Sequence, residues 1–198
     1  VAGGAGVPAM VRSRGADALV IFDGKRGDIG NTSEQYARAI LGDHGYDAVT
    51  VNPLMGHDAV EPFLRDPERG VFLLCLTSNP GAEDFLLHGE LYKRIAEKAV
   101  EWNIHGNVGL VVGATRPEMA AGVRAIAPDL PLLIPGVGAQ GGALAETIDA
   151  IGGRTNPRFL INSSRGIMFA EPRDGETQLG AAGRAARELR DAINPALR

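Results

Sequence analysis

Residues 70–76 (Gly-Val-Phe-Leu-Leu-Cys-Leu) form an apolar run that passes directly into the polar residues 77–79 (Thr-Ser-Asn). A short apolar run without the alternation of a half-exposed strand is typical of a strand buried on both faces of a parallel sheet. Five other runs share this character, and they cover residues 18–22, 47–51, 108–112, 130–135 and 158–161. Segments with helical spacing lie between them, so the chain is predicted to alternate strand and helix around a parallel sheet.

The predicted helices lie between and after these strands, at residues 33–41, 58–64, 90–102, 117–126, 142–151 and 177–193, and residues 7–14 are predicted to end a further helix. Thr32 followed by Gln35 fits a capping box, and Pro117 suits a first helical turn. No repeat, low-complexity segment or hinge-like linker interrupts the alternation. We therefore expect one domain over residues 1–198.

The position of the polar residues favours a (β/α)₈ barrel over an open doubly wound sheet. Nearly every predicted strand ends in a polar or glycine-rich cluster, and a barrel builds its active site from the loops at that end of its strands. Barrels typically have about 250 residues, so two absent βα units of about 30 residues each account for the difference. We expect an α/β protein of the (β/α)₈ (TIM) barrel class, with its first two βα units absent before Val1.

The composition excludes several classes of protein. With 44% hydrophobic and 22% charged residues the chain fits an ordinary globular domain, and its apolar runs are far too short to span a membrane. No signal segment opens the sequence, so we expect no membrane contact and a cytoplasmic location. A net charge of −4 gives no overall basic field for nucleic acid. Cys75 lies in an apolar run, which indicates a buried structural thiol, and the scattered histidines predict no metal site.

The densest polar cluster is residues 22–32 (Phe-Asp-Gly-Lys-Arg-Gly-Asp-Ile-Gly-Asn-Thr), directly after a predicted strand. Asp23 and Lys25 lie two apart in an extended segment, so their side chains point to one side and can form an ion pair at the barrel mouth. Asp28 can join them only if the loop curls back or a second subunit supplies it. A lysine flanked by carboxylates keeps its proton and can act as a general acid. The alternative interpretation is a surface salt-bridge cluster.

Two loops after the last predicted strands are suited to bind an anion. Residues 135–142 (Pro-Gly-Val-Gly-Ala-Gln-Gly-Gly) lead into a helix, whose N-terminus attracts negative charge, although such turns also serve packing alone. Residues 162–166 (Asn-Ser-Ser-Arg-Gly) offer an arginine fork beside backbone donors. If two strands are missing, these loops follow strands seven and eight, where barrels commonly bind phosphate. The sequence thus predicts a small substrate that carries a phosphate.

Taken in order, these motifs resemble the orotidine 5′-monophosphate decarboxylase family. The similarity rests on residues 23–32 and is continued by 77–81 (Thr-Ser-Asn-Pro-Gly), 111–115, 135–142 and 162–165. The resemblance implies a carboxy-lyase without cofactor or metal, which converts orotidine 5′-monophosphate to uridine 5′-monophosphate and CO₂. It also implies the last step of de novo UMP biosynthesis, and a homodimer with shared active sites.

The resemblance assigns a role to individual residues. It implies that Lys25 protonates C6 of the pyrimidine, that Asp23 presses against the substrate carboxylate, and that Asp28 reaches into the partner's site. The substrate-binding residues that it implies are Ile29 and Thr32 toward the partner's site, Ser78 on the pyrimidine, Gln140 and Arg165 on the phosphate, and Pro135 and Ser164 beside them. Ser78 equally fits a simple turn.

Two other functions remain open at this point. A magnesium-dependent lyase of the same superfamily, acting on a keto-sugar phosphate, shares the Asp-x-Lys-x-x-Asp pattern, although the insert Arg26-Gly27 argues against it. A barrel that binds a phosphate ligand without catalysis is the other alternative. The family also has a further Asp and a further Lys after its first two strands, and neither precedes Val1. We expect these residues to exist upstream of the sequence.

Overall fold

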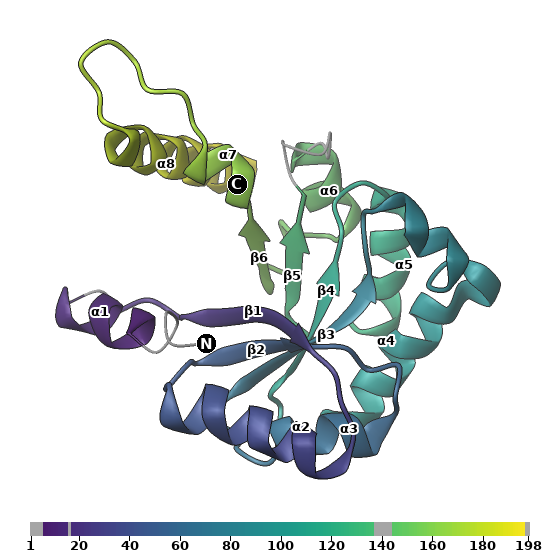
Figure 1. Ribbon diagram of the computed structural model, residues 1–198. Coiled ribbons are helices and arrows are strands. Elements are labelled where there is room, and N and C mark those ends of the chain that lie inside the picture. The colour runs from purple at the N-terminus through teal and green to yellow at the C-terminus, as the bar shows by residue number, and fades with distance from the viewer. Residues whose placement is uncertain (1–5, 16, 137–143, 197–198) are drawn as a thin grey trace. The chain divides into compact units, whose positions relative to one another are not determined.

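The computed structural model describes residues 6–15, 17–136 and 144–196, and it alternates strands and helices along the chain (Figure 1). The six strands in these ranges are β1 (Ile21–Arg26), β2 (Ala48–Val51), β3 (Gly70–Leu76), β4 (Val108–Val112), β5 (Leu132–Pro135) and β6 (Phe159–Asn162). Each corresponds to a predicted apolar run. Only β1 is clearly displaced, because it extends through residues 23–26, which were predicted to be a loop.

Helices precede, connect and follow the strands. They are α1 (Val7–Ser13), α2 (Gly30–Ala37) with a π-helical continuation (Arg38–Asp43), α3 (His57–Leu64), α4 (Leu91–Trp102), α5 (Pro117–Ile126), α6 (Leu144–Ala150), α7 (Ser164–Met168) and α8 (Gln178–Ala196). Short 3₁₀ turns at Pro80–Asp84 and His88–Glu90 precede α4. In the described ranges, no helix has both the length and the apolar character needed to cross a membrane.

The predicted capping box at Thr32 is wrong. The helix α2 begins at Gly30, its N-cap is Ile29, and no side chain caps it, so Thr32 lies inside the first turn. Gly30 has a φ of +50°, and the carboxylate of Asp28 accepts a hydrogen bond from the Ile29 N–H at 2.8 Å. Because glycine adopts this left-handed conformation easily, the chain turns into the helix earlier than the threonine signal indicates.

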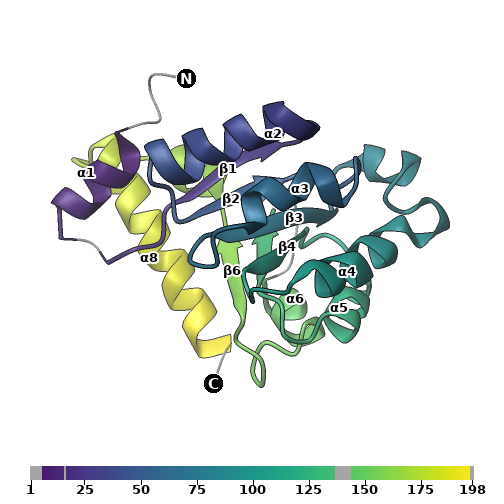
Figure 2. The same cartoon turned by 90° about the horizontal axis from the view of Figure 1, so that it is seen from below.

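The chain divides into two compact units, and the first comprises residues 1–75 and 94–111. In it β1 pairs with β2 and β2 with β3, both in parallel. Helices α2 and α3 lie side by side along these strands (Figure 2), and the buried Ser33 hydroxyl of α2 donates a hydrogen bond to the Ala59 carbonyl of α3 at 2.5 Å. The core of this unit is made of fully buried aliphatic and aromatic side chains, among them Val49, Val51, Val60, Phe63 and Leu73.

The second unit comprises residues 76–93 and 112–198. Strands β5 and β6 pair in parallel from Leu132 opposite Phe159 to Pro135 opposite Asn162. The buried guanidinium of Arg124, near the end of α5, donates hydrogen bonds of 2.7–3.3 Å to the carbonyls of Ala127, Pro128, Leu130 and Arg158. Burial lowers the pKa of Arg124, and the charge of Arg158 adds to this effect. One side chain thus holds the end of α5 to the starts of β5 and β6.

Replacement of Arg124 by methionine is expected to lower the free energy of unfolding by about 3 kcal/mol, because several buried carbonyls lose their donor. Urea unfolding measures the change. Arg154→Met is the matched control, since Arg154 forms an exposed ion pair with Asp149, and that variant is expected to lose less than about 1 kcal/mol. Equal losses in the two variants would contradict the role of Arg124.

Candidate active site

Asp23 and Lys25 form an ion pair on β1. The Lys25 Nζ lies 2.7 Å from Asp23 Oδ1, as the spacing of the two residues predicted. The Lys25 side chain is 49% exposed and the Asp23 side chain is 41% exposed, so a ligand can reach both. The pair therefore combines a fixed ammonium and a fixed carboxylate at an open position.

A β-bulge places this pair. Phe22 lies opposite Val49 and Arg26 opposite Val51, so residues 23–25 of β1 face Thr50 alone on β2. Lys25 has a φ of +45°, a left-handed conformation that is uncommon for a residue with a side chain. Bulges of this kind redirect side chains and are frequent beside active sites. Here the bulge brings the Asp23 and Lys25 side chains into contact.

Thr50 completes the cluster from β2, where its side chain is fully buried. Its hydroxyl donates a hydrogen bond to Asp23 Oδ1 at 2.9 Å and accepts one from the Lys25 backbone N–H, also at 2.9 Å. This residue was not predicted to belong to the site, because a threonine within the run 47–51 looks like an ordinary strand residue. The available signal was a single hydroxyl in a strand predicted to be buried on both faces, where a buried polar group needs a partner.

The Arg26 side chain, at the end of β1, lies over two aromatic rings. The Arg26 guanidinium lies 5.4 Å from the ring centroid of Phe22 and 5.2 Å from that of Tyr36. The Phe22 ring also meets the Tyr46 ring edge-on at 5.1 Å. A Cβ atom added at Gly24 would lie 2.1 Å from the Phe22 ring. Because its neighbours hold this ring in place, only glycine fits between Asp23 and Lys25.

Gly24→Ala is accordingly expected to destabilise the protein by about 2 kcal/mol through overpacking. Gly122→Ala serves as the control, since Gly122 lies inside α5 and an added Cβ there meets nothing within 4 Å. That variant is expected to gain up to about 1 kcal/mol from helix propensity. Thermal or urea unfolding checks both signs, and a neutral Gly24→Ala would show that the Phe22 ring is free to move.

Asp28, Ile29 and Thr32 lie at the start of α2 and do not join the ion pair. Within the described ranges, Asp28 forms no ion pair, and its carboxylate accepts a hydrogen bond from the neighbouring Ile29 N–H. The Ile29 side chain is 58% exposed, and Thr32 is also exposed. The sequence left two ways for Asp28 to join the ion pair, a loop that curls back or a second subunit. In the structure the loop does not curl back to Lys25.

The remaining predicted residues belong to the second unit. Ser78 follows β3 and lies close to Gly113, which follows β4. A Cβ atom at position 113 would lie 2.9 Å from the Ser78 backbone nitrogen, so the close approach of the two segments requires a glycine there. Pro135 ends β5, and the Ser164 hydroxyl at the start of α7 lies 3.5 Å from Asn162 Oδ1. These positions are the carboxyl ends of β3, β5 and β6.

Arg165 is exposed in α7, a short helix that was not predicted. Its guanidinium forms no hydrogen bond or ion pair with any other residue that the structure describes. Gln140 lies outside the described residues, as does most of the glycine-rich segment around it. An exposed arginine without a protein partner leaves all its donors for an anion.

Cys75 is fully buried in β3, which confirms the predicted structural thiol. Burial raises the pKa of this thiol to about 12, so the group stays protonated near neutral pH. Over the described ranges, no group of three or more His, Cys, Asp or Glu side chains is placed to hold a metal ion.

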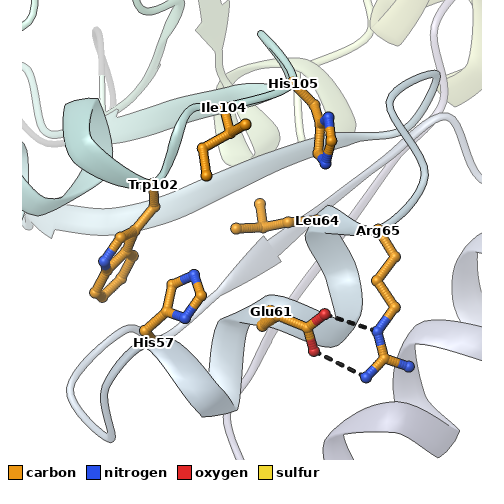
Figure 3. A pocket seen from close by; sticks show the side chains of 7 residues that line it. All are labelled: His57, Glu61, Leu64, Arg65, Trp102, Ile104 and His105. Atoms are coloured by element: carbon orange, nitrogen blue, oxygen red, sulfur yellow. Dashed lines mark hydrogen bonds and ion pairs between the residues drawn. The ribbon is translucent and has the colours of Figure 1, made fainter.

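A cavity of about 320 Å³ lies between α3 and the end of α4 in the first unit (Figure 3). The His57 and Trp102 rings pack against each other at 5.2 Å on one side of it. On the other side Arg65 donates two hydrogen bonds to Glu61, at 2.8 and 2.9 Å, and these bonds lower the pKa of Glu61. The charges here neutralise each other and none of the predicted site residues lines this cavity, so it is separate from the candidate site.

Known proteins are similar to this chain in sequence and in fold. The family model described as "Orotidine 5'-phosphate decarboxylase / HUMPS family" matches residues 2–178. Proteins named orotidine 5'-phosphate decarboxylase from Roseiflexus castenholzii and from Roseiflexus sp. strain RS-1 are 49% and 52% identical over 203 and 185 residues. The matches cover 100% and 90% of this chain, and 74% and 67% of those proteins.

A solved structure is similar as well. The Leishmania donovani OMP decarboxylase aligns with a TM-score of 0.80 at 40% identity, over 94% of this chain and 71% of that chain. Together with the alternating βα units, this likeness confirms the predicted (β/α)₈ barrel class.

Proposed function

Because the chain belongs to the orotidine 5'-phosphate decarboxylase / HUMPS family, we propose that it is a carboxy-lyase that converts orotidine 5′-monophosphate to uridine 5′-monophosphate and CO₂. The observation that carries this proposal is the Asp23–Lys25 ion pair at the carboxyl end of a barrel strand. The proposal includes a single barrel domain, a cytoplasmic setting and the last step of UMP biosynthesis.

Lys25 is the proposed proton donor. When the bond from C6 to the carboxylate breaks, its electron pair stays on C6. The ring cannot delocalise the negative charge of this pair. A fixed ammonium stabilises this charge and then transfers a proton from Nζ to C6. Asp23, held at 2.7 Å from Lys25, repels the substrate carboxylate, and this repulsion disappears when neutral CO₂ leaves.

Residues that follow β3, β5 and β6 are the proposed contacts to the rest of the nucleotide. Ser78 hydrogen-bonds the pyrimidine, and Gln140 with Arg165 binds the phosphate, next to Pro135 and Ser164. The exposed, unpaired Arg165 guanidinium supports this assignment within the described chain. Binding energy from the remote phosphate offsets the repulsion at the reacting carboxylate, which is how a non-reacting group raises the rate.

The proposed assembly is a homodimer in which Asp28, Ile29 and Thr32 complete the partner's site. Two observations support it. Asp28 has no cationic partner among the described residues of its own chain, and Ile29 exposes an apolar side chain beside it. The side chains of Leu54 and Met55 are also about half exposed, and Met55 lies against Gly27, close to Ile29 in sequence. Burial of such apolar groups is a normal driving force for association.

The ultraviolet absorbance of orotidine 5′-monophosphate tests the proposed reaction. Incubation with the purified protein in excess chelator is expected to remove the orotate chromophore and to release one UMP for each substrate consumed. A folded protein that leaves the chromophore unchanged would overturn the proposal. Turnover of a keto-sugar phosphate that stops when chelator is added would instead assign the magnesium-dependent lyase.

A further inference from the structure

The geometry points to Thr50 as a positioning residue, which locks the Asp23–Lys25 pair in its reactive arrangement; this inference rests on the proposed function. No polar group of β2 other than Thr50 faces the three bulged residues of β1, since Phe22 and Arg26 pair on either side of them. The Thr50 hydroxyl contacts both members of the ion pair.

The backbone N–H of Lys25 is bonded to a side chain of the neighbouring strand. In a regular parallel ladder, a strand N–H is accepted by a carbonyl of the neighbouring strand. The bulge interrupts this ladder, and the Lys25 N–H is accepted instead by the Thr50 hydroxyl at 2.9 Å. The φ of +45° at Lys25 is a strained conformation that persists only where the surroundings fix it. The Thr50 side chain supplies one such fixed contact.

The carboxylate of Asp23 accepts two hydrogen bonds at the same oxygen. A threonine hydroxyl has a single proton, and this one is donated to Asp23 Oδ1 at 2.9 Å. The same oxygen accepts the Lys25 ammonium at 2.7 Å. Both donors hold Oδ1, and no hydrogen bond from a described residue reaches Oδ2. The carboxylate is therefore anchored by one oxygen, and the other is left for the substrate side.

Thr50 is shielded from water inside β2. The Thr50 side chain is fully buried between the equally buried Val49 and Val51, so water cannot replace its hydroxyl. The amide, the hydroxyl and the carboxylate form a continuous chain of hydrogen bonds, in which each bond polarises the next. Loss of the hydroxyl leaves the Lys25 N–H without its acceptor, and it leaves Asp23 Oδ1 with the Lys25 ammonium as its one remaining donor among the described residues.

Thr50→Val tests the inference with little change in volume. We expect kcat to fall about 10- to 100-fold, as misplacement of a reacting group does, while KM changes less than about threefold. Thr50→Ser keeps the hydroxyl and is expected to restore kcat to within about threefold of wild type. If Thr50→Val does not fold, Thr50→Ala gives the same comparison.

Asn107→Ala is the matched control for lost stability. The buried Asn107 amide of the same unit donates hydrogen bonds to the carbonyls of Leu64, Asp66 and Arg69, ahead of the starts of β3 and β4. This variant is expected to unfold more easily and to keep the kcat of wild type. A merely structural role for Thr50 would make Thr50→Val behave in the same way.

Amide hydrogen exchange at Lys25 gives a readout that does not depend on catalysis. Exchange of this N–H is expected to be at least about tenfold faster in Thr50→Val and close to wild type in Thr50→Ser and Asn107→Ala. The inference is overturned if Thr50→Val keeps either the wild-type kcat or the wild-type exchange, or if serine fails to restore them. A wild type that does not decarboxylate the nucleotide refutes the proposed function, and the exchange measurement still decides whether Thr50 holds Lys25.

Discussion

Lys25→Ala is expected to reduce kcat for decarboxylation by about 10⁵-fold, because the variant loses both the proton donor and the positive charge at C6. Its stability is expected to change by less than about 1 kcal/mol, since the Asp23–Lys25 pair is nearly half exposed and such pairs contribute little. Single-turnover absorbance and urea unfolding, measured on the same sample, separate the loss of chemistry from a loss of fold.

Two further variants sharpen this prediction. Lys25→Arg keeps a cation beside Asp23, but a guanidinium does not release its proton, so its kcat is also expected to be very low. Lys98→Ala is the matched control, because Lys98 pairs with Glu101 on the exposed face of α4, and it is expected to keep full activity. A kcat above about 1% of wild type in Lys25→Ala would show that another group protonates C6.

Much of the fold was predictable because it depends on local patterns. Strands β3 and β4 and helix α5 have the predicted bounds, since two uninterrupted apolar runs and a proline at the first helical turn define them. Strand β1 was displaced for a physical reason. Its end carries charged side chains, and these residues join the strand through pairing with β2, which lies more than 20 residues away in sequence. Apolar periodicity contains no information about such pairing.

The candidate site also has features that were predicted from the sequence and features that were not. The ion pair of Asp23 and Lys25 was predicted from their spacing in an extended segment, but the structure forms it through a bulge with a left-handed backbone at Lys25. The bulge, the left-handed backbone at Lys25 and the contact with Thr50 were not predictable, since a register irregularity and a hydrogen bond between positions 25 residues apart leave no local pattern. The short helix α7 was missed because five residues are too few to show helical spacing.

Two inactive variants, Lys25→Ala and Asp28→Asn, are expected to restore activity when they are mixed. In the proposed homodimer each site takes Lys25 from one subunit and Asp28 from the other. A mixed dimer therefore has one site with both substitutions and one site with neither. Random reassociation makes half of the dimers mixed, so activity is expected to reach about a quarter of the wild-type value.

The structure provides a strict control for this experiment. Asp23 and Lys25 pair within one chain, whereas Asp28 has no ionic partner among the described residues of that chain. A mixture of Lys25→Ala with Asp23→Asn therefore leaves every site with a defect, and it is expected to remain inactive. Subunits with different affinity tags verify that mixed dimers form. If they form and neither mixture regains activity, Asp28 does not act across the interface, and the shared site is refuted.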